Sequence, residues 1–131
     1  MVQPPDNEKL TINLGFVDLG HIDLLVQNGF YSNRSDFIRT AIRNQVNAHV
    51  EVTKQAATHL KLELGIRHFS REVLEAAKAK GEQLNIKVLG LATIADDVSP
   101  ELAVATIASL TVLGALHAPS AVKSALADRL K

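Results

Sequence analysis

One short alternation of polar and apolar residues, followed by two helical segments, constrains this chain more than any other feature. Residues 9–14 read K-L-T-I-N-L, the pattern of a strand with one buried and one outward face. Two segments with apolar residues at helical spacing follow before residue 50. A single copy of roughly 50 residues is too small to bury a core. Two copies that pair their strands would solve this problem and would create a two-stranded ribbon of the size that fits a DNA major groove.

The two faces of the predicted strand differ in chemistry. Lys9, Thr11 and Asn13 face outward, and these residue types suit the edges of guanine, thymine and adenine in a DNA major groove. The alternative is an ordinary half-buried strand whose outer face meets only water. We expect the apolar face to form the dimer core together with two residues of the second helix, the full set being Leu10, Ile12, Leu14, Ile38 and Ile42.

Two helices are predicted after the strand. We expect the first to have Asp18 as its N-cap and to end at Asn28-Gly29, because glycine readily adopts the left-handed conformation. We expect the second to have Ser32 as its N-cap. The predicted buried stripes are Leu19, Ile22, Leu25 and Val26 in the first helix and Phe37, Ile38, Ala41, Ile42 and Val46 in the second.

The start of the second helix is a candidate phosphate site. Asn33, Arg34 and Ser35 would present backbone N–H groups without intrahelical acceptors, and such groups bind anions. A phosphate there would fix the position of the ribbon on a duplex without reading its sequence. The alternative is a plain capped helix.

Together these residues resemble the ribbon-helix-helix family of DNA-binding proteins, which includes Arc, MetJ and CopG-type regulators. The resemblance covers residues 8–50 and is most specific in G-F-Y-S-N-R-S-D-F-I-R-T-A-I-R. It implies an intertwined dimer whose antiparallel ribbon enters the major groove of double-stranded DNA. By this resemblance, Lys9, Thr11 and Asn13 read bases, and Ser32, Asn33 and Arg34 bind the phosphate backbone.

Three features depart from the family pattern. Gly15 stands at an outward position where many members carry a long polar side chain, and the proline often found between ribbon and helix is absent. Residues 1–50 contain four Lys or Arg against five Asp or Glu, a net charge of −1. Because phosphate neutralisation supplies much of the affinity for DNA, we expect one dimer to bind weakly unless several dimers act together.

A spacing of about 24 residues organises the second half of the chain. I-K-V-L-G at residues 86–90 returns as L-T-V-L-G at 110–114, and a looser copy begins near Leu62. Each copy is predicted to be a strand, a turn and a short helix, with Ser70 as one helix cap and Ser99-Pro100 as the start of another. Residues 119–131 are predicted to form one closing helix. The fold class is therefore α+β, with strand-helix repeats after the N-terminal module.

The last predicted strand, residues 110–116, is strongly apolar, and only a short segment follows it. A bare strand edge invites pairing with another chain, so we expect residues 61–131 to form higher homo-oligomers. The alternative is a monomeric α/β module that covers its own edge.

The predicted organisation is a flexible arm at 1–8, the ribbon-helix-helix module at 9–50, a connector at 51–60 and the repeat domain at 61–131. Residues 47–60 either extend the second helix or connect the two domains. The chain has no cysteine, which excludes disulfides and thiolate chemistry. It has no signal peptide, membrane span or catalytic motif, so we expect a cytoplasmic protein that is not an enzyme and needs no cofactor. Its five histidines are scattered, which makes a metal sensor the weaker alternative.

These features predict a transcriptional repressor whose C-terminal repeats join DNA-bound dimers. Three alternatives remain open. The chain could be an antitoxin, a DNA-organising or partition protein, or a structural assembly protein that uses the N-terminal module only to dimerise.

Overall fold

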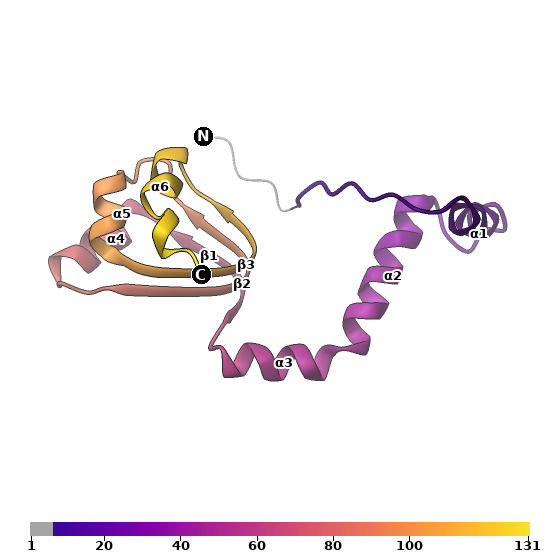
Figure 1. Cartoon of the computed structure of the whole chain (residues 1–131), viewed down its shortest axis with the longest axis horizontal. Coiled ribbons are helices and arrows are strands. Elements are labelled where there is room, and N and C mark those ends of the chain that lie inside the picture. The colour runs from indigo at the N-terminus through magenta and orange to yellow at the C-terminus, as the bar shows by residue number, and fades with distance from the viewer. Residues whose placement is uncertain (1–6) are drawn as a thin grey trace. The chain divides into compact units, whose positions relative to one another are not determined.

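The computed structural model describes residues 7–131, and these form two compact units (Figure 1). The N-terminal unit spans residues 7–55 and the C-terminal unit residues 56–131. Most of the predicted arm at residues 1–8 lies outside the described residues. In the part that is described, no helix is long and apolar enough to cross a bilayer.

The N-terminal unit consists of an extended segment and helices. Residues 7–15 contain no regular element and are exposed. Helix α1 (Phe16–Gln27) and helix α2 (Arg34–Ala48) follow, and after a break at His49 comes helix α3 (Val50–His59), which continues into the C-terminal unit. Residues 47–60 therefore contain the end of α2 and a separate helix.

The predicted start of the first helix is wrong. The N-cap is Gly15 and not Asp18, because the N–H of Leu19 already donates to the carbonyl of Gly15 at 3.1 Å. Asp18 therefore lies inside the first turn, where a negative charge is favourable. The predicted end is confirmed, because Gly29 has a φ of +84° immediately after the C-cap residue Asn28.

The predicted cap of the second helix is wrong by one residue. Asn33, not Ser32, is the N-cap, and its Oδ1 accepts a hydrogen bond from the N–H of Asp36 at 2.8 Å. The carboxylate of Asp36 in turn accepts from the N–H of Ser32 at 2.9 Å. This reciprocal arrangement is close to a capping box, with an aspartate in the place of the usual glutamate.

The N-terminal unit buries few apolar side chains in one chain. Ile22 of α1 is only 5% exposed, and Tyr31 and Phe37 make an edge-to-face contact with ring centroids 5.1 Å apart. The stripe predicted for the second helix is half-buried at its start, at Phe37 and Ile38. It is not buried further along, because in the described chain nothing packs on that face of α2 at Ala41, Ile42 and Val46.

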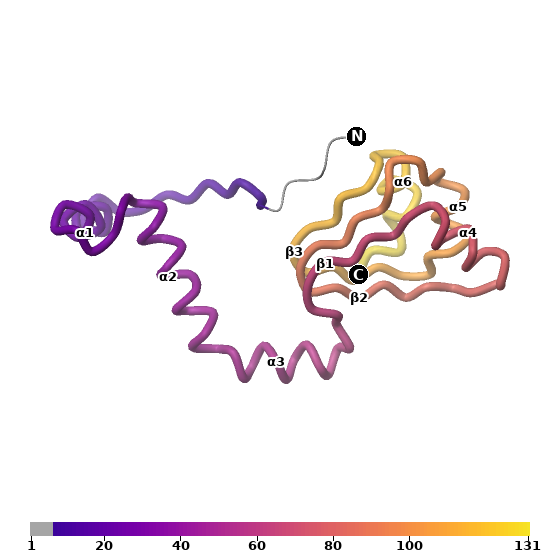
Figure 2. The backbone as a smooth tube through the Cα atoms, turned by 180° about the vertical axis from the view of Figure 1, so that it is seen from behind, coloured from indigo at the N-terminus to yellow at the C-terminus, as the bar shows by residue number. Residues whose placement is uncertain are grey.

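The C-terminal unit alternates strands and short helices. Its elements are β1 (Glu63–Phe69), α4 (Arg71–Ala79), β2 (Leu84–Ile94), α5 (Pro100–Thr106), β3 (Ile107–His117), α6 (Ser120–Ala125) and a 3₁₀ turn (Ala127–Arg129). The strands form one parallel sheet in the order β1-β2-β3, so that spatial order follows chain order. The helices lie on the inner side of the sharply bent sheet (Figure 2).

A row of three glycines crosses the sheet. Gly65 lies opposite Gly90, and Gly90 lies opposite Gly114, so the spacings are 25 and 24 residues. All three have φ values between +119° and +139°, which other residues rarely adopt. A Cβ at Gly90 would lie 2.2 Å from the carbonyl oxygen of Gly65, and one at Gly114 would lie 2.1 Å from that of Gly90. Glycine therefore permits the close approach of the strands.

The core of the C-terminal unit lies between the sheet and the helices.

The caps predicted at Ser70 and Ser99 are confirmed, because each hydroxyl accepts from the backbone N–H three residues later. The single closing helix predicted at 119–131 is wrong, because α6 ends at Ala125 and a separate 3₁₀ turn follows. The side chains packed in the core are Phe69, Leu74, Ile86, Val88, Ala92, Ile94, Val98, Leu102, Ala103, Ile107, Leu110, Val122 and Leu126.

Candidate nucleic-acid interface

The three residues predicted to read bases lie in the extended segment before α1. Lys9, Thr11 and Asn13 are exposed, and none of their side chains has a hydrogen-bond partner in residues 7–131. Their donors and acceptors are therefore available to another molecule. The segment pairs with no strand in the described chain, so its pairing into a ribbon stays a prediction.

The apolar residues that alternate with them are also uncovered. Leu10 is 80% exposed, and Ile12 and Leu14 are exposed as well. On α2, Ile42 is exposed and Ile38 half-buried. The five residues assigned to a dimer core are thus accessible to a second chain, wholly or in part.

The start of α2 carries backbone donors beside a carboxylate. Asn33 caps the N–H of Asp36, whereas the N–H groups of Arg34 and Ser35 have no acceptor among residues 7–131. These two N–H groups can donate to a phosphate oxygen. The carboxylate of Asp36 is held at the same helix start by the N–H of Ser32, which opposes an incoming anion.

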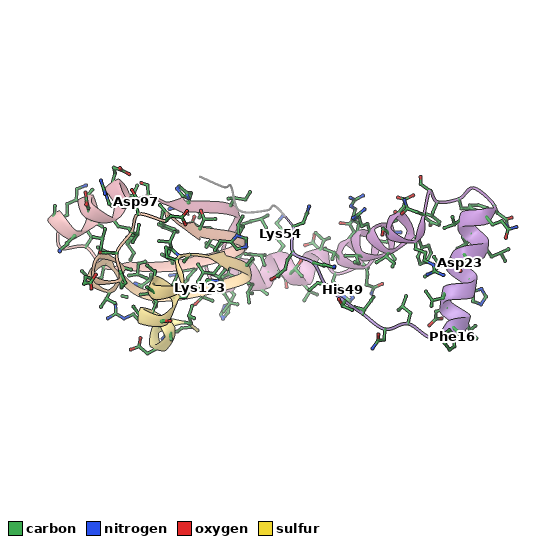
Figure 3. The ribbon with its side chains drawn as sticks, turned by 90° about the horizontal axis from the view of Figure 1, so that it is seen from above. Phe16, Asp23, His49, Lys54, Asp97 and Lys123 are labelled. Atoms are coloured by element: carbon green, nitrogen blue, oxygen red, sulfur yellow. The ribbon has the colours of Figure 1, made fainter. Side chains whose placement is uncertain are left out.

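Arg34 does not project freely towards solvent. Its Nε and Nη2 donate to the two carboxylate oxygens of Asp23 on α1, each at 2.8 Å, and this ion pair joins the two helices. The hydrogen bond from Arg34 lowers the pKa of Asp23, and the same bond raises the pKa of Arg34. Figure 3 labels Asp23 on α1, together with Phe16 at the first residue of that helix. A phosphate at Arg34 would have to share this guanidinium with Asp23 or displace the carboxylate.

The sequence reading missed the two carboxylates that shape this helix start. Asp36 follows Asn33 by three residues, and this capping spacing could have identified both residues. Asp23 lies 11 residues before Arg34 on a different helix, so no local spacing indicates the pair. Arg39 and Arg43, farther along α2, are exposed cations.

No metal centre is found in the part of the chain that the structure describes. Among residues 7–131, no three histidine, aspartate or glutamate side chains lie close enough together to hold an ion. His68 contacts the hydroxyl of Thr93, and His49 contacts the amide of Gln45 at 3.2 Å.

Comparison with known families adds a further observation. A sequence model described as the Ribbon-Helix-Helix transcriptional regulator family matches residues 5–123. This match spans most of the chain and includes the C-terminal sheet as well as the N-terminal helices. No curated protein and no solved structure matches the chain.

Proposed function

The chain belongs to the ribbon-helix-helix transcriptional regulator family, and we propose that it is a repressor that binds specific DNA sequences as an intertwined dimer. The observation that carries this proposal is the N-terminal unit itself. It exposes outward polar residues and unpaired apolar residues on the same extended segment, which is the arrangement that a two-stranded DNA-binding ribbon needs.

Dimerisation accounts for the exposed apolar side chains. Pairing two copies of residues 9–14 would supply the missing backbone hydrogen bonds and would cover Leu10, Ile12 and Leu14. Packing against the second chain would also cover Ile38 and Ile42 of α2. Full burial of one exposed side chain of this kind contributes about 1.5–3 kcal/mol, so the four exposed residues, with a smaller contribution from the half-buried Ile38, supply a large driving force for association.

In such a dimer, Lys9, Thr11 and Asn13 are the base-reading residues. Lysine donates to guanine, the threonine methyl group contacts the methyl group of thymine, and asparagine pairs with adenine. At each end of the ribbon, the N–H groups at Arg34 and Ser35 would hold a phosphate, in a clamp that includes Ser32 and Asn33.

Charge limits the affinity of a single dimer. Residues 7–55 contain five Lys or Arg and five Asp or Glu, so the unit is neutral. Arg34 is already paired with Asp23. We propose that the C-terminal units join dimers on neighbouring half-sites, because a linked second dimer binds at high effective concentration.

The first experiment measures binding of the full chain to its own upstream DNA and to random DNA by fluorescence anisotropy, across a salt series. We expect a preference for the upstream sequence and an affinity that falls steeply with salt. The Lys9→Ala/Asn13→Ala variant should lose this preference, whereas Lys78→Ala on α4 removes the same charge and should keep it. Absence of binding at low salt would refute a DNA-binding role and leave the N-terminal unit as a dimerisation device.

The ion pair at α2 gives a second test of the same interface. Asp23→Asn releases Arg34 and removes one negative charge, so DNA affinity should rise. The slope of log affinity against log salt should steepen by about 0.9 for each guanidinium that gains a phosphate. Asp18→Asn changes the charge equally without touching Arg34 and is the matched control. Equal effects of the two variants would exclude a direct contact between Arg34 and phosphate.

A further inference from the structure

The C-terminal sheet has two edges that the described chain leaves largely unpaired. β1 pairs with β2 on one side only, and β3 pairs with β2 on one side only. In residues 7–131, the pairing found outside the named strands is a parallel bridge between Leu110 and Leu130, with a hydrogen bond of 2.8 Å from the N–H of Lys131 to the carbonyl of Leu110. The outer side of β3 from Val112 onwards and the outer side of β1 thus present backbone donors and acceptors to a further strand.

The two free edges match in level and direction. β1 lies opposite Val88–Ile94 of β2, and the uncovered half of β3, residues 112–117, lies opposite Val88–Thr93. All three strands are parallel. A second copy could therefore place its β3 beside β1 and continue the sheet without any change of direction.

The side chains on the outer face of the sheet extend this match. Leu64 aligns with Leu89 and Leu113 in one row, and Ile66 aligns with Leu91 in the next. In the middle strand these leucines are half-buried, since neighbouring strands flank them. At the β1 edge, Leu64 is 84% and Ile66 67% exposed. A further strand would give these two residues the apolar neighbours that β2 already has.

The backbone of β1 has the conformation that such a neighbour requires. Gly90 and Gly114 have positive φ, and each lies against the carbonyl of the preceding strand. Gly65 has a φ of +119° as well, although nothing lies within 4 Å of the position where its Cβ would be. At Gly65, β1 therefore has room for a carbonyl group of a further strand, which the single chain does not supply. The carbonyls of Gly65 and Gly90 each face the following strand, and by the same geometry the carbonyl of Gly114 points away from β2.

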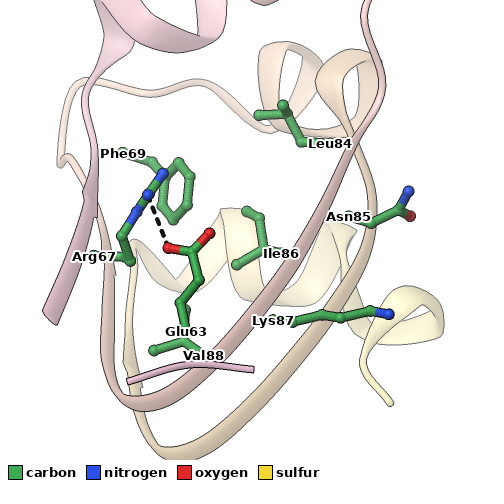
Figure 4. A pocket seen from close by; sticks show the side chains of 8 residues that line it. All are labelled: Glu63, Arg67, Phe69, Leu84, Asn85, Ile86, Lys87 and Val88. Atoms are coloured by element: carbon green, nitrogen blue, oxygen red, sulfur yellow. Dashed lines mark hydrogen bonds and ion pairs between the residues drawn. The ribbon is translucent and has the colours of Figure 1, made fainter. Parts of the chain in front are cut away.

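A hollow at the β1 end of the sheet completes the fit. β1 begins opposite Val88, so Leu84–Lys87 of β2 has no strand on that side, and a cavity of about 150 Å³ lies there (Figure 4). Its lining includes the ion pair of Glu63 with Arg67 at 2.8 Å and also Lys87, which has no ion-pair partner among residues 7–131. At the other edge of the sheet, Leu130 lies beside Leu110 of β3, and Leu110 lies opposite Ile86 of β2.

We propose that the C-terminal units join head to tail, with β3 of one copy adding in parallel to β1 of the next so that Gly114 lies opposite Gly65. In this register, Leu130 of the first copy reaches the hollow beside Leu84–Lys87 of the second. The contact uses different surfaces on the two partners and leaves one free edge at each end, so further subunits can add to both ends. This proposal rests on the proposed function in one respect, namely that the C-terminal unit joins DNA-bound dimers.

Disulfide cross-linking of the full chain tests the register, because the sequence contains no cysteine. Leu64→Cys protein is mixed with Leu113→Cys protein and oxidised mildly. Neighbouring strands lie about 5 Å apart, which a disulfide can bridge, so the mixture should give covalent dimers. Each variant alone should stay uncrosslinked. Within one chain the two positions are separated by β2, at about 10 Å, so the Leu64→Cys/Leu113→Cys double variant should form a ladder of higher species.

Two further mixtures make the result decisive. Ile66→Cys with Ala115→Cys probes the same register at a second row, in case one pair disturbs the sheet. Leu64→Cys with Val73→Cys on the exposed face of α4 is the control, and it should not cross-link. Cross-links in each single variant alone, or in neither registered mixture, would overturn the head-to-tail arrangement. DNA binding of the same proteins is measured in parallel, so that a failure of this contact and a failure of the DNA-binding role are told apart.

Discussion

The glycine row of the C-terminal sheet gives the sharpest prediction, since replacing Gly90 with alanine should be far more costly than the same change at Gly65. Both residues have positive φ, and holding a non-glycine residue there costs about 1–3 kcal/mol. Only at Gly90 does the new methyl group also meet backbone, 2.2 Å from the carbonyl oxygen of Gly65.

The second cost follows from the strand separation. β1 has to move by more than about 1 Å before this contact reaches an ordinary van der Waals distance. Such a movement lengthens the ladder hydrogen bonds on both sides of Gly90, each contributing about 1 kcal/mol. We therefore expect Gly90→Ala to lower the free energy of unfolding of this unit by about 3–5 kcal/mol and Gly65→Ala by about 1–3 kcal/mol.

Hydrogen exchange of the full chain, followed by mass spectrometry, measures this difference locally. Peptides from β2 and β3 report opening of the C-terminal unit, and peptides from α1 report the N-terminal unit separately. The samples should be dilute, so that association through the β1 edge does not contribute. Gly20→Ala in α1 is the control, because a Cβ there meets nothing within 4 Å. It should stabilise α1 by up to about 1 kcal/mol.

Equal losses for Gly90→Ala and Gly65→Ala would refute the reasoning, because the contact with the neighbouring carbonyl would then contribute nothing. Retention of full protection in Gly90→Ala would also refute the assignment of a positive φ at this position.

Three further predictions concern single side chains. Lys61 follows α3 and Gly81 follows α4 at the same position, and both have a positive φ, which glycine adopts at lower cost than lysine or alanine. Lys61→Gly should therefore raise the thermal midpoint and Gly81→Ala should lower it, each by the equivalent of about 1 kcal/mol or less. Leu74 is fully buried in α4, so calorimetry of Leu74→Ala should show a loss of about 2–5 kcal/mol in the free energy of unfolding. The neighbouring residue Val73 is half-exposed, so Val73→Ala should lose far less. Similar losses for the two variants would contradict the assigned helix face. Because Arg34 lowers the pKa of Asp23, the stabilisation by this pair is complete above the ordinary aspartate value of 3.8 and is lost as the pH falls through the lowered pKa. An NMR titration of the Asp23 carboxyl carbon should show this lowered midpoint, and Arg34→Ala should return it to the ordinary value.

The sequence predicted those parts of the fold that depend on neighbouring residues. The caps at Ser70 and Ser99 and the turn at Gly29 depend on interactions within one helical turn, and all three are confirmed. The N-caps predicted at Asp18 and Ser32 were wrong, because α1 begins after Gly15 without a side-chain cap and because Asn33, not Ser32, has the three-residue spacing to Asp36. The family resemblance of residues 8–50 is confirmed by a match that extends to residue 123.

Other features could not be predicted because they depend on contacts between distant residues. The Asp23–Arg34 pair needs the angle between two helices, which no spacing encodes. The spacing of about 24 residues between the glycines can be seen in the sequence, but their positive φ values depend on how closely the neighbouring strands approach each other. In the proposed DNA site, Lys9, Thr11 and Asn13 are accessible, but their roles depend on a second chain and on DNA.

The agreement between chain order and spatial order in the C-terminal sheet also bears on how this unit folds. Each strand pairs only with the strand before or after it in sequence, and α5 packs mainly against its neighbours α4 and α6. No contact has to wait for the two ends of the chain to meet, so the loop-closure entropy of each step is small. Folding can therefore begin at β1-α4-β2 or at β2-α5-β3 and spread by one strand and one helix at a time. During synthesis, the segment β1-α4-β2 can form before β3 has left the ribosome.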